Sequence, residues 1–393
     1  MSLLIDNVRL WDGTGSPAQS RMSVEVRDGR IFWIGPASDW HGSLVSTRII
    51  DGSARTLLPG LMDCHVHYSS PGGPDWIARF TDPLPEISIR AVDLAEVSLR
   101  SGITTARDVG APHEVNIRLA RASEAGEIRA PRIHAAGAWI AYRGTYVPFA
   151  RHFGDARELR EAIKAEMDAG ASLIKVALSA WNEGARPQDA PNIPFDEKLL
   201  SAAVDEAHKA GFRIACHAND PESCHIAASS GVDSIEHGMF LQQNDLGAMV
   251  KNKTFLVPTM SVWDAMSYYA RAVDWPESRR QRAESLREGS RKAVSSAVQA
   301  GVPIALGTDA GGGAARHGRI AREAELMVEC GMETQDALLS GTSSAARLIG
   351  EAERGTIEKG KIADLVMLDA DPLENVAALR LVAAVFQGGK RVA

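Results

Sequence analysis

The segment Leu173-Ile174-Lys175-Val176-Ala177-Leu178 is an apolar run that is interrupted by a single lysine. A near-continuous apolar run is typical of a parallel strand that is covered by helices on both faces. A lysine almost never lies inside such a core without a partner. The segment therefore predicts a buried strand, and it marks Lys175 as a candidate functional residue.

Similar runs recur along the middle of the chain and alternate with helical stretches. The eight strand candidates are residues 57–67, 104–110, 132–140, 172–179, 213–219, 234–240, 254–260 and 303–311. The helical stretches include residues 89–101, 156–169, 197–210, 221–230 and 278–300. Strand and helix alternating eight times predicts an α/β fold, a (β/α)8 TIM barrel over residues 57–349.

The two ends of the chain have a different texture. Met22-Ser23-Val24-Glu25-Val26 and Arg30-Ile31-Phe32-Trp33-Ile34 are rich in β-forming residues, and Asp28-Gly29 between them is a hairpin signal. Residues 364–369 and 382–386 have the same strand-like character. We expect residues 1–56 and 350–393 to pair into one small sheet domain.

Composition excludes several classes of protein. The 393 residues are 45% hydrophobic and 24% charged, and the net charge of -7 comes without a basic block, which argues against nucleic acid as the partner. No apolar stretch is long enough to span a bilayer, and the first residues lack the apolar core of a signal peptide. The four cysteines show no paired spacing, and Cys64 and Cys216 lie on expected buried strands. These features predict a cytoplasmic protein with reduced thiols.

Polar side chains lie at or near the ends of five expected strands. They are His65 and His67 on the first strand, Lys175 on the fourth, His217 on the fifth, His237 on the sixth and Asp309 on the eighth. In a barrel, the carboxyl ends of all strands meet at one mouth. Residues at i and i+2 on a strand face the same side, so His65 and His67 can reach one ion. This pattern predicts a two-metal hydrolytic site, and imidazole is a good ligand for zinc.

Lys175 requires a separate explanation, because a protonated lysine would repel two cations. Burial lowers the pKa of a lysine and makes its neutral amine available. A neutral amine can add carbon dioxide and become a carbamate, which is a bridging anion. The alternative is a lysine that pairs with a core carboxylate, but no acidic partner stands out among its sequence neighbours.

Five motifs and the C-terminal segment resemble those of the amidohydrolase superfamily. The motifs are Pro59-Gly60-Leu61-Met62-Asp63-Cys64-His65-Val66-His67, Ile174-Lys175-Val176, Cys216-His217-Ala218, Ser234-Ile235-Glu236-His237-Gly238 and Gly307-Thr308-Asp309-Ala310-Gly311, and residues 355–366 resemble the closing segment of the family. Within the superfamily the chain is similar to the binuclear, metal-dependent hydrolases of the prolidase and imidazolonepropionase-like branch. That branch includes peptidases for Xaa-Pro and basic C-terminal residues, and hydrolases of aryl amides and ureas.

The resemblance implies a barrel with a β-sandwich made from both chain ends, and two divalent ions, usually zinc. His65, His67 and Asp309 would hold the more buried ion, and His217 and His237 would hold the other. Carboxylated Lys175 would bridge the two ions. The substrate would be a small molecule, and barrels of this family often assemble, which leaves room for a homo-oligomer.

The chain departs from the peptidase members in three places. The stretch 179–184 lacks their double glycine, Asn219 replaces their tyrosine or histidine after the fifth strand, and residues 142–146 lack their Gly-His pair. These positions contact substrate rather than metal in the family. The metal ligands are therefore retained, whereas the groups that read a dipeptide differ.

We expect a hydrolase of an amide-type C–N bond that uses a metal-bridging hydroxide, on an N-acyl or aryl amide, carbamate, urea or dipeptide-like substrate. Asp309 would take the proton of the nucleophile and pass it to the leaving nitrogen. The candidate substrate contacts are Tyr142, Arg143, Tyr146, Asn219 and His317. Gly311-Gly312-Gly313 after the eighth strand predicts a loop, and no Gly-Lys-Ser/Thr follows that would favour a phosphate loop.

Three other functions are consistent with parts of this pattern. An Xaa-Pro-type dipeptidase or carboxypeptidase would use the same metal ligands. A mononuclear deaminase or cyclic-amide hydrolase of the superfamily would lack a lysine on the fourth strand, so Lys175 disfavours it. A barrel kept as a non-catalytic scaffold would have lost ligands, and none is lost here.

Overall fold

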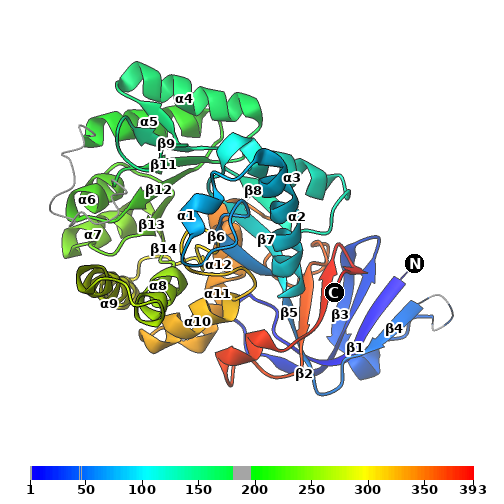
Figure 1. Ribbon diagram of the computed structural model, residues 1–393. Coiled ribbons are helices and arrows are strands. Elements are labelled where there is room, and N and C mark those ends of the chain that lie inside the picture. The colour runs from blue at the N-terminus through cyan, green and yellow to red at the C-terminus, as the bar shows by residue number, and fades with distance from the viewer. Residues whose placement is uncertain (1, 44, 46, 180–195) are drawn as a thin grey trace.

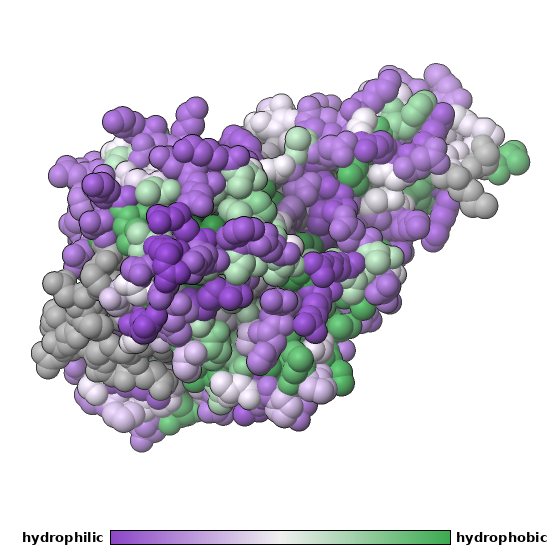
Figure 2. Space-filling view, turned by 90° about the horizontal axis from the view of Figure 1, so that it is seen from above, coloured by the Kyte–Doolittle hydropathy of each residue, from purple (hydrophilic) through white to green (hydrophobic). Residues whose placement is uncertain are grey.

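The computed structural model describes residues 2–43, 45, 47–179 and 196–393. The chain forms an α/β barrel and a smaller β-rich part, and the two described ends of the chain lie together in the β-rich part (Figure 1). In the space-filling view the barrel is the wider lobe, and hydrophilic side chains cover much of the visible face (Figure 2). The predicted fold class, a (β/α)8 barrel with a β-sandwich, is confirmed.

The barrel wall is built from parallel strands. Its strands are β6 (Leu61–Val66), β7 (Ile103–Asp108), β8 (Arg132–Ala135), β9 (Trp139–Tyr142), β11 (Ile174–Ala177), β12 (Ile214–Ala218), β13 (Ser234–His237) and β14 (Phe255–Val257), with β10 (Arg151–Phe153) added beside β9. They form the orders β6-β7-β8 and β10-β9-β11-β12-β13-β14. Every residue of β11 is buried, as the apolar run around Lys175 predicts.

The eighth strand of the barrel is irregular. The prediction of a regular strand over residues 303–311 is wrong, because only Ile304 and Ala310 form isolated bridges, to β14 and β6 respectively. The chain still closes the barrel: the Cys64 amide donates to the Leu306 carbonyl at 2.8 Å, and the Asp309 amide donates to the His65 carbonyl at 2.8 Å. The irregularity has a local cause, because Asp309 adopts a φ of 52°.

The third strand is broken in the middle. We expected one strand over residues 132–140, but β8 ends at Ala135 and β9 begins at Trp139. Gly137 between them has a φ of 75°, and a Cβ there would lie 2.0 Å from the Glu166 carboxylate. The Ala138 amide donates to that carboxylate at 3.1 Å instead of to a neighbouring strand, which interrupts the ladder.

Helices cover the outside of the barrel (Figure 1). They are α1 (Trp76–Arg79), α2 (Leu84–Arg100), α3 (Val115–Glu124), α4 (Ala156–Ala169), α5 (Glu197–Lys209), α6 (Pro221–Ser229), α7 (Gln243–Asn252), α8 (Met260–Ala272), α9 (Glu277–Ala300), α10 (Ile320–Glu329), α11 (Thr334–Ser340) and α12 (Ser343–Ile349), with short 3-10 turns at η1 (Ala37–Asp39), η2 (Pro112–Glu114) and η4 (Val376–Arg380). Aspartates cap α4, α5 and α6: Asp155, Asp196 and Asp220 each accept a hydrogen bond from a backbone amide of the first turn.

The β-rich part joins both ends of the chain in one sheet. Its strands are β1 (Ser2–Leu10), β2 (Gln19–Arg27), β3 (Arg30–Pro36), β4 (Thr47–Asp51), β5 (Thr56–Pro59), β15 (Leu365–Leu368), β16 (Val382–Gln387) and β17 (Lys390–Arg391), in the order β17-β16-β15-β5-β1-β2-β3 with β4 beside β1. Asp28 and Gly29 both have positive φ in the β2–β3 hairpin, as a type I′ turn requires. The sheet has its own apolar core, which includes Ile5 and Phe386. The domain limits drawn from sequence at residues 56 and 350 stay predictions.

Two further features bear on the sequence expectations. Within the described ranges, no helix combines the length and the apolar character that a membrane crossing needs. All four cysteines are free thiols, and Cys64, Cys216 and Cys224 are buried.

Candidate metal centre

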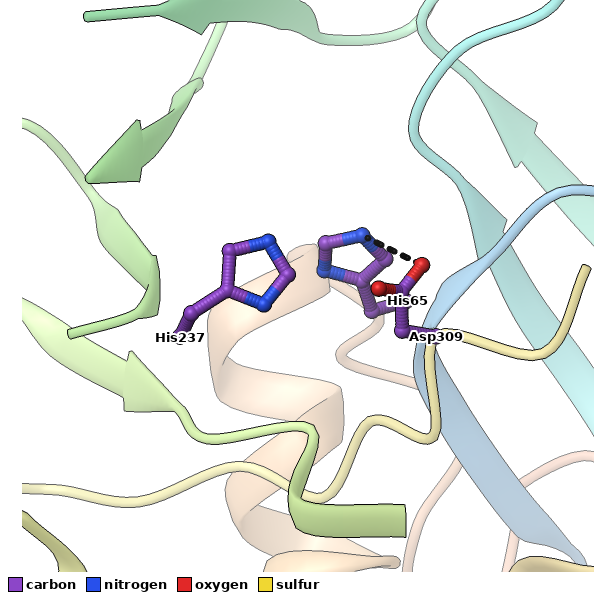
Figure 3. A group of neighbouring side chains, drawn as sticks. All are labelled: His65, His237 and Asp309. Carbon is purple, nitrogen blue, oxygen red and sulfur yellow. Dashed lines mark ion pairs between the residues drawn. The ribbon is translucent and has the colours of Figure 1, made fainter. Parts of the chain in front are cut away.

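The six predicted ligands come together at the carboxyl end of the barrel. His65 and Lys175 lie on β6 and β11, His217 and His237 lie near or at the ends of β12 and β13, and His67 and Asp309 follow directly on the barrel wall. All six are buried, and the most exposed, Asp309, retains 6% of its accessible surface. In Figure 3, His237 faces His65 and Asp309 across the mouth.

The distances between these groups suit a shared cation. His65 Nε2 and His67 Nε2 each lie 3.4 Å from Asp309 Oδ1. His65, His237 and Asp309 each offer a ligand atom, and these atoms lie within 4.8 Å of one another. The His217 and His237 rings are 4.7 Å apart. This group combines His65 and Asp309, predicted for one ion, with His237, predicted for the other. The two candidate ion positions are therefore adjacent.

Three of the imidazoles are oriented through their Nδ1 atoms. His67 Nδ1 donates to the Gly110 carbonyl at 2.8 Å, His65 Nδ1 lies 2.6 Å from a Glu236 oxygen, and His237 Nδ1 lies 2.6 Å from Thr259 Oγ1. Each contact leaves Nε2 for another partner. Fixing one ring nitrogen in this way is what metal-binding histidines require of their surroundings.

Among the described residues, two buried atoms of the predicted ligands have no hydrogen-bond partner. They are Asp309 Oδ1 and His217 Nδ1. Buried polar atoms are almost always satisfied, so a carboxylate oxygen and an imidazole nitrogen without hydrogen bonds at this position fit a group that would bind between them. The nitrogen and carboxylate donors fit a divalent metal ion.

Burial sets the protonation of the site. Desolvation lowers the pKa values of His65, His217 and His237 well below the usual histidine range, and the positive charge of Lys175 acts in the same direction. These imidazoles are therefore neutral, which is the form that binds metal. Desolvation also lowers the pKa of Lys175 to about 8, although the Glu236 carboxylate opposes the shift.

A buried ion pair that the sequence did not suggest supports the ligands. Arg107 on β7 donates to Glu236 at 2.7 Å, to Ser234 Oγ at 3.0 Å and to the Cys64 carbonyl. Glu236 is fully buried and holds His65 through its other oxygen. Arg107 and Glu236 could have been found from the sequence, because each is a charged residue inside an apolar strand run. The same feature singled out Lys175. Glu236 and Asp309 also supply the acidic surroundings of Lys175 that its sequence neighbours do not.

The structure brings two of the five predicted substrate contacts to the mouth. The Tyr146 ring lies 5.0 Å from the His217 ring, and Asn219 Nδ2 lies 3.3 Å from His217 Nε2. The altered stretch 179–184 lies outside the described residues beyond Ser179, whose hydroxyl accepts from the Asn219 amide.

The other three candidates lie elsewhere, each for a physical reason. Arg143 is exposed and pairs with Glu158 at 2.8 Å, so its charge stays in solvent. Tyr142 packs its ring edge-on against Phe153. His317 is buried and contacts the Ser70 carbonyl at 3.0 Å. Burial lowers the pKa of His317 to about 4.

The pocket above the centre has mostly aromatic and aliphatic walls. Besides the histidines and Asp309 it is lined by Trp76, Phe80, Trp139, Tyr146, Val147, Phe149, Val262, Trp263, Met266, Gly312 and Gly313. The Phe80, Trp139 and Phe149 rings pack against one another with centroids 5.3–5.5 Å apart. No lysine or arginine lies among the described lining residues. The loop glycines are needed for close packing, since a Cβ on Gly312 would lie 1.9 Å from Asp309 Oδ1.

Comparison with known proteins found a matching family model, sequence relatives and similar solved structures. Residues 56–392 match the model of the amidohydrolase family. An uncharacterized protein of Mycobacterium tuberculosis is 28% identical over 371 residues, covering 94% of this chain and 91% of that protein. Ochratoxinase of Aspergillus niger is 25% identical over 418 residues, covering 97% and 84%. The crystal structure of an Xaa-Pro dipeptidase with bound methionine in its active site superposes with a TM-score of 0.88 at 31% identity, covering 100% of this chain and 99% of that one.

Proposed function

The chain belongs to the amidohydrolase family and is a hydrolase of amide-type C–N bonds, and from this premise we propose that it uses two divalent ions, most simply zinc, to cleave an uncharged amide with an apolar or aromatic group. The proposal covers the metal arrangement, the state of Lys175 and the substrate class.

In the proposed centre, His65, His67 and Asp309 would hold one ion, and His217 and His237 would hold the other. Carboxylated Lys175 would be a shared ligand of both ions; its pKa of about 8 leaves a neutral fraction to add carbon dioxide at neutral pH. The orphaned Asp309 Oδ1 and His217 Nδ1 support one ligand from each set. When bound, the ions would lower the pKa of a water molecule and polarise the substrate carbonyl.

The protein supplies the proton transfers and the dry surroundings. Asp309 would accept the proton of the attacking water and return it to the leaving nitrogen, because its carboxylate lies at the mouth beside the candidate ion position. The aromatic walls exclude bulk water, which strengthens electrostatic interactions within the site. Glu236 and Arg107 are positioning residues that keep the His65 ring in place.

The single observation that carries the substrate class is the lining of the pocket. A substrate carboxylate needs a cation or several aligned donors, since burying an unpaired charge is costly. The described lining offers aromatic rings and aliphatic groups instead. Arg143, the one arginine among the predicted substrate contacts, is held in solvent by Glu158. The pocket therefore favours a neutral anilide, carbamate or urea.

A matched pair of substrates tests this proposal. Acetanilide and 4-acetamidobenzoate contain the same scissile bond and differ in one carboxylate. We expect the metal-loaded enzyme to favour acetanilide in kcat/KM by about tenfold or more, which corresponds to ~1.4 kcal/mol of transition-state binding. Equal turnover, or a preference for the carboxylate, would contradict the proposed substrate class.

An Xaa-Pro dipeptidase remains the second candidate, because a solved dipeptidase is 31% identical over the whole chain. Such an enzyme must read the free carboxylate of its substrate. Glycyl-proline and its uncharged amide form the corresponding pair. Faster hydrolysis of free glycyl-proline than of its amide, of acetanilide and of 4-acetamidobenzoate would favour the dipeptidase.

A further inference from the structure

A second cavity lies behind helix α8, back to back with the metal centre. It has a volume of about 700 Å³ and is bounded by α8, the start of α10, the end of α2 and η4. Helix α8 turns Trp263 toward the metal pocket and Asp264 toward this cavity. The loop after the eighth strand is divided likewise, with Gly312 facing the metal pocket and Ala314 and Arg316 facing the cavity.

The described residues that line the cavity include five arginines and a single carboxylate. The charged lining residues are Arg100, Arg316, Arg319, Arg322 and Arg380, with Asp264 as the only acid. The chain as a whole carries a net charge of -7, so this concentration of arginines runs against its overall balance. A surface of one sign that lines a concave site attracts ligands of the opposite sign.

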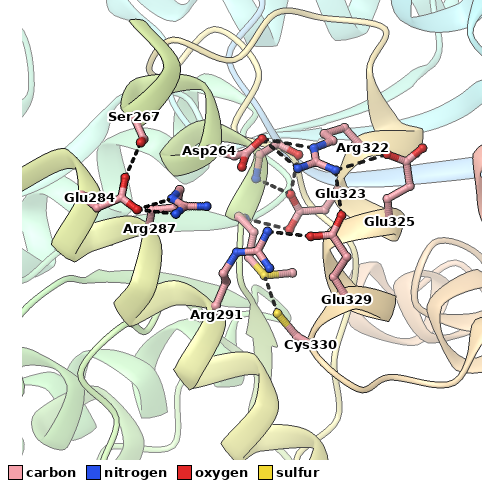
Figure 4. A network of polar contacts seen from close by, with 12 residues as sticks. Asp264, Ser267, Glu284, Arg287, Arg291, Arg322, Glu323, Glu325, Glu329 and Cys330 are labelled. Atoms are coloured by element: carbon pink, nitrogen blue, oxygen red, sulfur yellow. Dashed lines mark hydrogen bonds and ion pairs between the residues drawn. The ribbon is translucent and has the colours of Figure 1, made fainter. Parts of the chain in front are cut away.

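Three of the arginines are already neutralised by acids around the cavity. Arg322 binds Asp264 at 3.1 Å and Glu329 at 3.0 Å, as Figure 4 shows. Arg380 pairs with Glu325, and Arg100 pairs with Glu96 at 2.7 Å. Arg322 thus occupies the one carboxylate of the lining. The positive charges of these three arginines are therefore largely neutralised by their ion-pair partners.

Arg316 and Arg319 are different. Both are exposed, and among the described residues neither makes an ion pair or a side-chain hydrogen bond. Arg319 is the N-cap of α10 and forms no side-chain cap. Cations are unfavourable beside the positive end of a helix dipole. The guanidinium group of Arg319 is therefore kept where the helix itself disfavours a cation, and Arg316 adds a second unpaired cation to the lining of the same cavity.

We propose that this cavity is a second binding site, for a small organic anion with a doubly charged oxyanion group such as a phosphate monoester. Arg316 and Arg319 each offer a planar fork of donors that matches phosphate oxygens. Tyr268 and Tyr269 on α8 line the same cavity, with ring planes inclined at 78°, and give aromatic surface for the organic part of the ligand. The site is distinct from the metal centre, from which α8 and the loop separate it.

Calorimetric titration of the metal-loaded full chain with phenyl phosphate, at constant ionic strength, tests the site. We expect saturable binding with one ligand per chain. The double substitution Arg316→Gln/Arg319→Gln should weaken the Kd about tenfold or more. The matched control is Arg48→Gln/Arg118→Gln, which removes the same charge from two exposed arginines outside the cavity. This control should leave the Kd within about twofold.

Three outcomes would overturn the proposal. Wild-type protein that does not bind phenyl phosphate lacks the site. A Kd that both double variants weaken equally would reveal only a general charge effect. Binding that disappears with the metal, yet survives Arg316→Gln/Arg319→Gln, would place the anion at the metal centre. Acetanilide hydrolysis by the cavity variant, measured without phosphate, checks that the metal centre has stayed intact.

Discussion

Replacement of Glu236 by glutamine separates positioning of a metal ligand from general stability. Glu236 is fully buried and accepts hydrogen bonds from Arg107, at 2.7 Å, and from Ser234 Oγ, at 2.5 Å. Its other oxygen lies 2.6 Å from His65 Nδ1. Glutamine keeps the shape and removes the charge. Its NH₂ group must then face a donor, either Arg107 or His65.

The magnitude follows from these contacts. A hydrogen bond to a charged group contributes about 1.5–3 kcal/mol, and a buried Arg107 left without its counter-ion destabilises the fold further. Loss of a group that orients a ligand typically lowers metal affinity about 10–100-fold, or ~1.4–2.7 kcal/mol. We therefore expect Glu236→Gln to lose metal affinity by this factor and to lose stability as well.

The matched control is Glu166→Gln. Glu166 is also fully buried, pairs with Arg151 and accepts the Ala138 amide, but it does not contact a predicted metal ligand. Both variants should lose free energy of unfolding in urea. Competition with a metal-binding dye should show weaker metal binding only for Glu236→Gln. Wild-type metal affinity in Glu236→Gln, or an equal loss in Glu166→Gln, would refute the positioning role.

Three further predictions concern the bridge, the pocket wall and acid stability. Lys175→Ala should lose most activity, and full activity with two bound metals per chain, measured by elemental analysis, would remove the bridging role. Trp139→Ala should lower the free energy of unfolding by about 3–5 kcal/mol in urea, because the buried ring packs against Phe80 and Phe149; a loss under about 1 kcal/mol would contradict this packing. The pKa of Glu351 is lowered from 4.5 to about 2, chiefly by its hydrogen bond from His134. Its stabilisation, at most about 3 kcal/mol, is present above pH ~4.5 and is lost as the pH falls toward ~2, so the stability difference between wild type and Glu351→Gln should shrink between about pH 5 and pH 3.

The barrel and the meeting of the six predicted ligands could be read from the sequence because both depend on periodicity. Apolar runs of strand length that alternate with helices are compatible with few folds. In a barrel, residues at the ends of distant strands, such as His65 and Asp309, then lie at the same mouth. The broken third strand could not be read in this way. Its break depends on the Glu166 carboxylate, which reaches the Ala138 amide from helix α4. A contact between separate elements leaves no local signal.

The same reasoning explains which site residues were missed. Glu236 is visible in the motif beside His237, yet its partner Arg107 lies 129 positions away. Arg143 follows the third strand and was a reasonable candidate for substrate, but a long exposed side chain pairs with whichever carboxylate is near, here Glu158. An apolar sequence context predicts that a charged residue is buried. The orientation of an exposed charged side chain depends instead on which groups lie near it on the folded surface.

The choice of lysine at position 175 follows from charge balance in the two states of the centre. The charges that act on Lys175 are those of Arg107, Glu236 and Asp309. Without metal, two cationic and two anionic side chains balance in a buried site. Two divalent ions would upset that balance, and conversion of the ammonium to a carbamate shifts the side chain from one positive to one negative charge. A glutamate in its place would add a third buried carboxylate to the metal-free chain, where like charges repel and raise pKa values. With the proposed carboxylation, a lysine would match both states, since it would become anionic only when the cations that need an anion are present.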